Sequence, residues 1–155
     1  MPATARPLGS RDLDSVMAIE RAAFTDPWPR SAFVELLGQS HVRAFAVDGP
    51  DGPLAGYAFA SVAADEGEIL NLAVEPGVRR RGLGQDLLDA LLAMLRREGV
   101  GIVHLEVRES NAAAMRLYER AGFRPVSTRR GYYRNPTENA VTMALALAPE
   151  VAEKG

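Results

Sequence analysis

The chain contains no cysteine among its 155 residues. This absence excludes disulfide bonds, thiolate metal ligands and any mechanism that uses a cysteine nucleophile. A reducing, cytoplasmic compartment fits a chain of this composition. Any covalent or acid–base chemistry must therefore come from other side chains.

Long apolar runs and a net excess of positive charge are also missing. The start of the chain, MPATARPLGSRD, lacks the apolar segment of a secretory signal, and no run reaches the roughly 18 apolar residues of a membrane span. The formal net charge is −2, so no global basic field attracts nucleic acid. His41 and His104 are isolated and show no metal-ligand spacing. We therefore predict no membrane, nucleic-acid or metal partner.

What remains is the composition of an ordinary globular protein. Hydrophobic residues make up 47% and charged residues 25% of the chain, which is typical of a folded domain with a core of its own. We expect a single domain over residues 1–155, with an ordered core from about residue 5 to about residue 148 and a short tail at 149–155.

Apolar periodicity predicts two early helices and then a mixture of strands and helices. The first helix is expected to have Ser10 as its N-cap and to stop before residues 26–29, and the second to run from about Ser31 to Leu37. Later helices are expected around residues 85–97 and at Asn111–Ala121. Strands are expected at Arg6–Leu8, Val42–Val47, Leu54–Val62, Glu68–Val74, Ile102–Val107, Phe123–Thr128 and Ala140–Leu147. This order indicates a mixed α/β domain with a parallel crossover at its centre.

The segment NLAVEPGVRRRGLG, residues 71–84, joins a short apolar strand to a helix through a glycine-rich turn. Such a turn aims free backbone N–H groups and a helix N-terminus at an anion, and Arg79 to Arg81 add positive charge. The spacing after Gly84 is not that of a dinucleotide-binding fingerprint, and no Gly-Lys-Ser/Thr follows as in a P-loop. The turn alone leaves two interpretations open, a plain chain reversal and a phosphate site.

A second group of polar residues follows in the next strand. Glu106 stands among apolar residues, and strand alternation places it on one face with Ile102, His104 and Arg108. It is either a structural carboxylate, paired with Arg108 or placed at the edge of the sheet, or a general base. The residues themselves leave both interpretations open.

The helix after this strand carries two further candidates. Asn111 stands where an N-cap is expected. Tyr118 lies about two turns later, where an aromatic residue commonly fills a core. Taken singly, each of these residues has an ordinary structural explanation.

Together, the motifs E-I-L-N-L-A-V, R-x-x-G-x-G, L-E-V-R-x-S-N and A-x-x-L-Y-E-x-x-G-F, in this order, resemble the GNAT superfamily of acetyl-CoA-dependent N-acetyltransferases. The resemblance covers roughly Trp28 to Leu147. Within the superfamily the chain is most similar to the RimI type, which acetylates the N-terminal alanine of a small-subunit ribosomal protein. That similarity includes Pro27-Trp28-Pro29 before Phe33, Arg130-Gly131-Tyr132-Tyr133, and Glu138-Asn139-Ala140.

The resemblance implies the GNAT acyl-CoA N-acyltransferase fold, an α/β (α+β) mixed sheet whose central parallel strands, here Glu68–Val74 and Ile102–Val107, splay apart between flanking helices. Acetyl-CoA is the implied cosubstrate, with no metal. Its pantetheine arm is expected to pair with the backbone of Leu72, Ala73 and Val74. Its pyrophosphate is expected to lie over Arg80, Arg81, Gly82, Leu83, Gly84 and Gln85, with Arg79 and Asn111 as further contacts.

The resemblance also implies the chemistry. Without a cysteine or a G-x-S-x-G elbow, direct attack by the substrate amine in a ternary complex is the simplest route. Glu106 is then expected to be the base, directly or through a water, and Tyr118 the acid that protonates the thiolate. A backbone N–H near Ala73 or Val74 is expected to meet the oxyanion.

The substrate side follows from the same resemblance. Trp28, Tyr132 and Tyr133 are expected to flank the channel for the amine. The expected partner is the N-terminus of a ribosomal protein, in the cytoplasm. Three alternatives stay open: a small-molecule amine as substrate, relaxed specificity for several N-termini or a lysine, and an acyl-CoA-binding sensor without catalysis.

Overall fold

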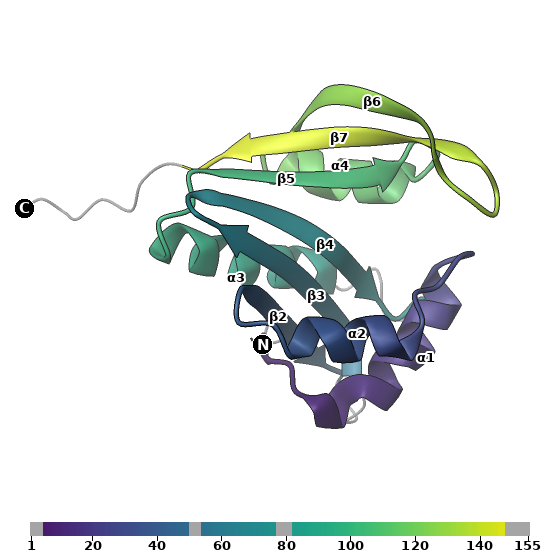
Figure 1. Ribbon diagram of the computed structural model, residues 1–155, viewed down its shortest axis with the longest axis vertical. Coiled ribbons are helices and arrows are strands. Elements are labelled where there is room, and N and C mark those ends of the chain that lie inside the picture. Colours follow the sequence, from purple (N-terminus) through teal and green to yellow (C-terminus); the bar gives the residue numbers. More distant parts are fainter. Residues whose placement is uncertain (1–4, 50–53, 77–81, 148–155) are drawn as a thin grey trace, which may run out of the picture.

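The computed structural model describes residues 5–49, 54–76 and 82–147. They form one seven-stranded sheet in the order β1-β2-β3-β4-β5-β7-β6, with helices on both faces (Figure 1). The strands are β1 (Arg6–Pro7), β2 (Val42–Asp48), β3 (Leu54–Ala63), β4 (Glu66–Val74), β5 (Ile102–Arg108), β6 (Arg124–Tyr133) and β7 (Glu138–Ala146). The helices are η1 (Ser10–Asp12, a 3₁₀ turn), α1 (Leu13–Ala23), α2 (Arg30–Leu37), α3 (Leu83–Arg97) and α4 (Ala112–Arg120).

The sheet is antiparallel on both sides of one parallel junction. Strands β1 to β4 pair antiparallel in chain order, and β5, β7 and β6 form a second antiparallel group. Strands β4 and β5 run parallel, joined by a crossover that contains α3. This arrangement confirms the predicted mixed α/β domain with a central parallel crossover.

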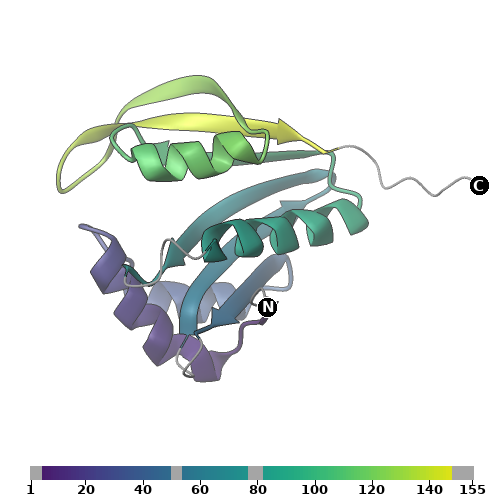
Figure 2. The same cartoon turned by 180° about the vertical axis from the view of Figure 1, so that it is seen from behind.

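Alternation along β3 separates two apolar cores on the two faces of the sheet. Tyr57 and Phe59 belong to the core with α1 and α2, whereas Ala58 and Ala60 belong to the core with α3 and α4. Figure 2 shows α3 and α4 in front of the sheet on that second face. The leucines of α3 that the sequence predicts as an apolar stripe are all buried there. Burial of these side chains stabilises both halves of the sheet.

The pairing of β4 with β5 is short. It covers four residue pairs, from Glu66↔Ile102 to Ile69↔Leu105. Beyond Ile69, β4 continues to pair with β3 as far as Val74, and β5 continues to pair with β7. The two central strands therefore diverge, as Figure 1 shows, and the predicted splay is confirmed.

A glycine allows α3 to lie close to the ladder between β3 and β4. A Cβ atom added at Gly56 would lie 2.9 Å from Leu87 Cδ1 and 3.0 Å from the carbonyl oxygen of Ala73. Both distances are shorter than ordinary van der Waals contact. Glycine at this position therefore lets the helix and the diverging end of β4 approach each other.

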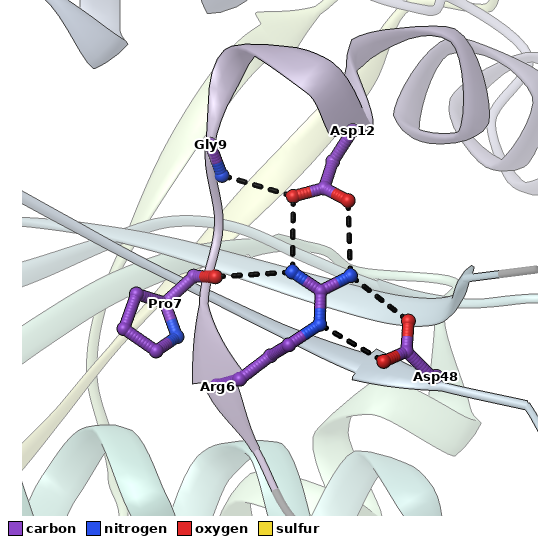
Figure 3. A network of polar contacts seen from close by, with 5 residues as sticks. All are labelled: Arg6, Pro7, Gly9, Asp12 and Asp48. Carbon is purple, nitrogen blue, oxygen red and sulfur yellow. Dashed lines mark hydrogen bonds and ion pairs between the residues drawn. The ribbon is translucent and has the colours of Figure 1, made fainter.

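The first helix starts differently from the prediction. Ser10 is not an N-cap; it begins the turn η1, and Gly9 occupies the cap position. The Gly9 N–H donates to Asp12 Oδ2 at 2.9 Å. The carboxylate of Asp12 is held in place by Arg6, so the capping side chain stands two residues further on than Ser10 (Figure 3).

Arg6 joins three separate pieces of the chain. Its guanidinium binds Asp12 through Nη1 and Nη2, at 3.1 and 2.9 Å, and Asp48 through Nε and Nη2, both at 2.9 Å. Bidentate pairs of this kind are among the stronger charge-assisted hydrogen bonds. As Figure 3 shows, they connect β1 to η1 and to the end of β2.

The strand β6 is longer than predicted. It runs to Tyr133 rather than ending at Thr128, and its register with β7 shifts twice, between Pro125 and Ser127 and between Arg129 and Tyr133. These shifts break the alternation of apolar and polar residues that indicates a strand. Among the described residues, no helix is long and apolar enough to cross a membrane.

Candidate functional site

A cavity of about 580 Å³ lies where β4 and β5 diverge. Its walls come from α1, the segment before α2, β4, β5, the start and middle of α4, and the end of β6. The residues predicted for the site that line it are Trp28, Leu72, Glu106, Asn111, Tyr118, Tyr132 and Tyr133. The fold therefore gathers candidates from distant parts of the sequence around one opening.

Glu106 lies at the edge of this cavity on β5. Its side chain is 16% exposed, and its Oε2 lies 2.7 Å from Arg129 Nε. The Thr142 hydroxyl, on the neighbouring strand β7, donates a longer hydrogen bond to the same oxygen at 3.4 Å. The carboxylate is thus held at a defined position beside the splay.

The alternative in which Glu106 pairs with Arg108 is wrong. The Arg108 guanidinium instead binds Glu138 at 3.2 Å and the carbonyl oxygens of Arg134 and Pro136 at 2.7 and 3.0 Å. Arg108 therefore fastens the connection between β6 and β7 to the end of β5, and this leaves Glu106 to a different arginine.

Tyr118 reaches the cavity from α4. The side chain is 7% exposed and packs edge-to-face against Phe123, with 5.6 Å between ring centroids. No side chain among the described residues hydrogen-bonds its hydroxyl, although the residue lines the cavity. Burial raises the pKa of this phenol above its ordinary value, because the charged form is poorly solvated there. The hydroxyl therefore keeps its proton at neutral pH.

Glu106 and Tyr118 belong to opposite faces of the sheet. On β5, Leu105 and Val107 point into the core that contains Tyr118, and alternation directs Glu106 to the other face. Both residues nevertheless line the same cavity. The splay thus connects the two faces, with a carboxylate on one side and a phenol on the other.

Asn111 has the structural role that the sequence predicts. Its Oδ1 accepts a hydrogen bond from the Ala114 N–H at 3.1 Å and caps α4. The residue also lines the cavity. A contact with a ligand there is compatible with its capping bond.

The predicted cofactor-binding residues on β4 and α3 lie at the edge of the opening. Leu72 lines the cavity, whereas Ala73 and Val74 are buried and pair with β3. Arg79, Arg80 and Arg81 lie outside the described residues.

The turn into α3 begins at a glycine in the left-handed region. Gly82 has φ of 73° and is the N-cap, and Leu83, Gly84 and Gln85 form the first turn of the helix. A Cβ at Gly84 would meet Leu117 Cδ2 at 3.5 Å, an ordinary contact, so packing does not require glycine there. Gln85 donates to Asp89 at 2.8 Å. A helix N-terminus that starts with small residues suits a phosphate ligand.

The aromatic candidates stand on two sides of the cavity. Trp28 packs on Phe33 with 5.4 Å between centroids. Tyr132 and Tyr133 make an edge-to-face pair at 5.1 Å. Burial is the main cause that raises the pKa of Tyr133 to about 12. Each aromatic residue therefore has a packing role as well as a place at the opening.

Glu20 is a residue of the cavity that the sequence reasoning missed. It is 1% exposed and accepts hydrogen bonds from the Tyr57 hydroxyl, from Asn71 Nδ2 at 2.9 Å and from the Trp28 backbone N–H at 2.9 Å. A signal existed, because Glu20 interrupts the apolar stripe of α1 at a position that faces the core. Buried carboxylates are rare unless they are fully paired, as this one is.

Among the described residues, no group of three or more acidic or histidine side chains is placed to hold a metal ion. The model of the Acetyltransferase (GNAT) family matches residues 13–123. The chain belongs to the acetyltransferase (GNAT) family. The family prediction is thereby confirmed, and the protein is an acetyl-CoA-dependent N-acetyltransferase.

The relatives extend this result to most of the chain. The Escherichia coli K12 [ribosomal protein bS18]-alanine N-acetyltransferase is 38% identical over 145 residues, which cover 91% of this chain and 95% of the relative. A Bacillus subtilis protein, called a putative enzyme of the same name, is 33% identical and covers 94% and 96%. The solved structure of the Escherichia coli ribosomal-protein-S18-alanine N-acetyltransferase superposes with a TM-score of 0.88 at 35% identity, with 99% of each chain covered. The similarity to the RimI type and the GNAT fold prediction are both confirmed.

Proposed function

We propose that this GNAT enzyme transfers an acetyl group from acetyl-CoA to the α-amine of an N-terminal alanine, on a ribosomal protein of the small subunit. The observation that carries the proposal is the cavity through the splay, which has Glu106 on one face and Tyr118 on the other. The names of the Escherichia coli relatives support the choice of substrate. A ribosomal substrate also favours the cytoplasm as the location.

The groups for acetyl-CoA lie along one edge of the opening. The backbone of Leu72, Ala73 and Val74 is proposed to extend the β4 edge toward the pantetheine arm. Gly82, Leu83, Gly84 and Gln85, at the start of α3, are proposed to hold the pyrophosphate together with Arg79, Arg80 and Arg81, and Asn111 is proposed as a further contact. Support comes from the divergence of β4 from β5 and from the N-terminus of α3.

The substrate ammonium loses two protons in becoming an amide, and the product thiolate gains one. In the proposed sequence Glu106 takes a proton from the substrate ammonium, directly or through a water. The amine nitrogen then forms a bond with the thioester carbonyl carbon, and the C–S bond breaks as Tyr118 gives its proton to the sulfur. The second proton leaves the nitrogen as the amide forms and restores the phenol of Tyr118 through solvent. A backbone N–H near Ala73 or Val74 is proposed to stabilise the oxyanion. The buried, protonated phenol of Tyr118 supports its part as the acid.

The peptide is proposed to approach on the face that carries Glu106. Trp28 on one side and Tyr132 and Tyr133 on the other flank this entrance. The aromatic side chains offer flat apolar surface to the first residues of an extended peptide. Acidic residues at the same cavity, Asp26 and Glu68, favour a cationic substrate.

A test with matched peptides separates the possible substrates. The purified protein is mixed with acetyl-CoA and a peptide that begins with alanine and carries an internal lysine, and release of free CoA and the site of acetylation are measured. Acetylation at the N-terminus supports the proposal. The same peptide with a blocked N-terminus serves as control, because acetylation there identifies lysine as the acceptor.

Two further results would each contradict the proposal. If small amines are acetylated and peptides are not, the enzyme is a small-molecule acetyltransferase. If calorimetry detects acetyl-CoA binding but no amine yields free CoA, the protein is a sensor. Mass spectrometry of ribosomal proteins from cells with and without the gene then tests the identity of the acceptor, through the loss of one N-terminal acetyl group.

A further inference from the structure

The Glu106 carboxylate forms an ion pair with a cationic side chain of the protein itself. The closest contact of its carboxylate is the 2.7 Å ion pair with Arg129 Nε. The same guanidinium lies over the ring of Tyr132, 5.1 Å from the ring centroid. Burial raises the pKa of Tyr132, and the nearby Glu106 carboxylate raises it further. A carboxylate and an aromatic face together form a site for one cation.

The strand register explains how Arg129 reaches this position. Glu106 on β5 is opposite Thr142 on β7, and Thr142 is opposite Ser127 on β6. Directly paired residues share a face of the sheet, so Glu106, Thr142 and Ser127 form a row. Arg129 is two residues beyond Ser127 on the same face, and its long side chain reaches back across β7 to β5.

The two partners differ in how firmly they are held. The side chain of Glu106 is 16% exposed, whereas that of Arg129 is 58% exposed. An ion pair with one solvated partner has a small net stability, because the arginine recovers its hydration when it leaves. The carboxylate is therefore the fixed half of the pair, and Arg129 is the half that moves at low cost.

In the part of the chain that the structure describes, Glu106 forms no ion pair with any other cation. On β5, His104 and Arg108 share the face of Glu106, and Arg108 is committed to Glu138 and two carbonyl oxygens. Glu68 on β4 is opposite His104, and Thr142 on β7 is neutral. Arg129 is thus the cation that the described residues provide to Glu106.

We propose that Arg129 occupies, in the free enzyme, the place that the ammonium group of the substrate takes in the ternary complex. The inference rests on the proposed function, in which Glu106 accepts the proton of that ammonium. The incoming amine then displaces the guanidinium from the carboxylate and from the Tyr132 ring. Arg129 is a specificity-determining residue, because only an acceptor with a cationic amine replaces it charge for charge.

The test compares Arg129→Gln with Arg129→Lys. Removal of the internal cation frees Glu106, so Arg129→Gln is expected to lower the KM for an alanine-starting peptide by about two- to fivefold, the range for a partly exposed ion pair. The Kd of the peptide for the CoA-bound enzyme, measured by calorimetry, is expected to fall by the same factor. The lysine variant keeps a cation and is expected to keep the wild-type KM. Arg130→Gln, at the neighbouring exposed position, is the matched control and is expected to change neither value.

A purely structural role gives the opposite pattern, because loss of a structural contact raises KM or lowers the melting temperature. If Arg129→Gln leaves KM and Kd unchanged or raises them, the inference is wrong. It is also wrong if Arg129→Lys behaves like Arg129→Gln. Failure of the proposed function is recognised separately, because the wild-type protein itself then neither binds nor acetylates the peptide. In that case the inference is wrong as well.

Discussion

The hydroxyl of Tyr57 on β3 donates a hydrogen bond to the carboxylate of Glu20 on α1, and both side chains are buried. The same carboxylate holds Asn71 of β4, just beyond the last residue pair between β4 and β5, and the backbone N–H of Trp28. One buried acid thus fixes the strand at the splay relative to the segment at the proposed peptide entrance.

Glu20→Gln is predicted to loosen the segment at Trp28. A glutamine has one carbonyl oxygen where the carboxylate has two acceptors, so one donor loses its partner, at a cost of about 1–3 kcal/mol. Trp28 is the single tryptophan of the chain, and its fluorescence therefore reports this segment directly. We expect a red shift of the emission and a higher KM for the peptide than in the wild type.

Tyr57→Phe provides the matched control for Glu20. It removes a donor to the same carboxylate but leaves the bond from the Trp28 N–H to Glu20 in place. We expect lower stability with unchanged emission. An identical emission spectrum for Glu20→Gln and the wild type would show that Glu20 does not hold this segment.

Tyr118→Phe is predicted to lower kcat by about 10²-fold or more, the usual contribution of a general acid. Affinity for acetyl-CoA should change little, because the ring still packs on Phe123. Since burial raises the pKa of Tyr118 above 10, the wild-type kcat should show no alkaline loss from this group up to about pH 10. Steady-state kinetics across pH check both points, and an unchanged kcat would remove Tyr118 from the mechanism.

Glu106→Gln is predicted to make the rate depend more strongly on high pH. Without the carboxylate, only substrate amine that has already lost its proton in solution reacts, and this fraction rises with pH. The amide keeps the size of the side chain and still accepts a hydrogen bond from Thr142. A pH profile of kcat/KM equal to that of the wild type would mean that another group is the base.

The sequence alone predicts the central part of this fold well. Apolar strands such as those ending at Val74 and Val107 have strong periodic patterns, and the family motifs lie on them or directly after them. Contacts between residues far apart in the chain were missed instead. Arg6 binds Asp48, which lies 42 residues further along the chain, and the partner of Arg129 depends on how β6 and β7 pair with β5. Local pattern does not encode such long-range partners.

The candidate site likewise combines residues whose positions the sequence predicts with contacts that it does not predict. The places of Glu106, Asn111 and Tyr118 at the cavity follow from motifs, whereas the ion pair of Glu106 with Arg129 rather than Arg108 does not. Arg108 was suggested as the partner of Glu106 because the two residues share a face of the same strand. The actual partner comes from another strand, because side chains also meet across neighbouring strands of the sheet.

Gly56→Ala is predicted to destabilise the protein by about 1–3 kcal/mol, the usual cost of overpacking. The new methyl group would press on the Leu87 side chain and on the carbonyl oxygen of Ala73. Movement of β4 at Ala73 should also raise the KM for acetyl-CoA. The free energy of unfolding in urea measures the first effect. Gly101→Ala is the control, because its nearest neighbour is a backbone oxygen 3.9 Å away, and equal stability losses in the two variants would refute the steric explanation.

Asp12→Asn is predicted to remove a pH-dependent contribution to stability. The Arg6 guanidinium holds the pKa of Asp12 below its usual range, so the folded state favours the ionised carboxylate. This stabilisation is complete above the unfolded pKa of about 4 and is lost as the pH falls through the lower folded pKa. The melting temperatures of wild type and variant should therefore differ at pH 7 and converge toward pH 3. A difference that persists at low pH would contradict this origin.

The register of β7 has a practical consequence for experiments on the enzyme. Ala146 is opposite Ile102, and Ile102 is opposite Glu66, so β7 ends where β4 and β5 are still paired. The cavity lies at the other end of that short ladder. An affinity tag or surface linker attached on the C-terminal side of Ala146 is therefore joined to the sheet at the end where β4 and β5 are still paired. Immobilisation through it leaves the approach of peptide and cosubstrate open.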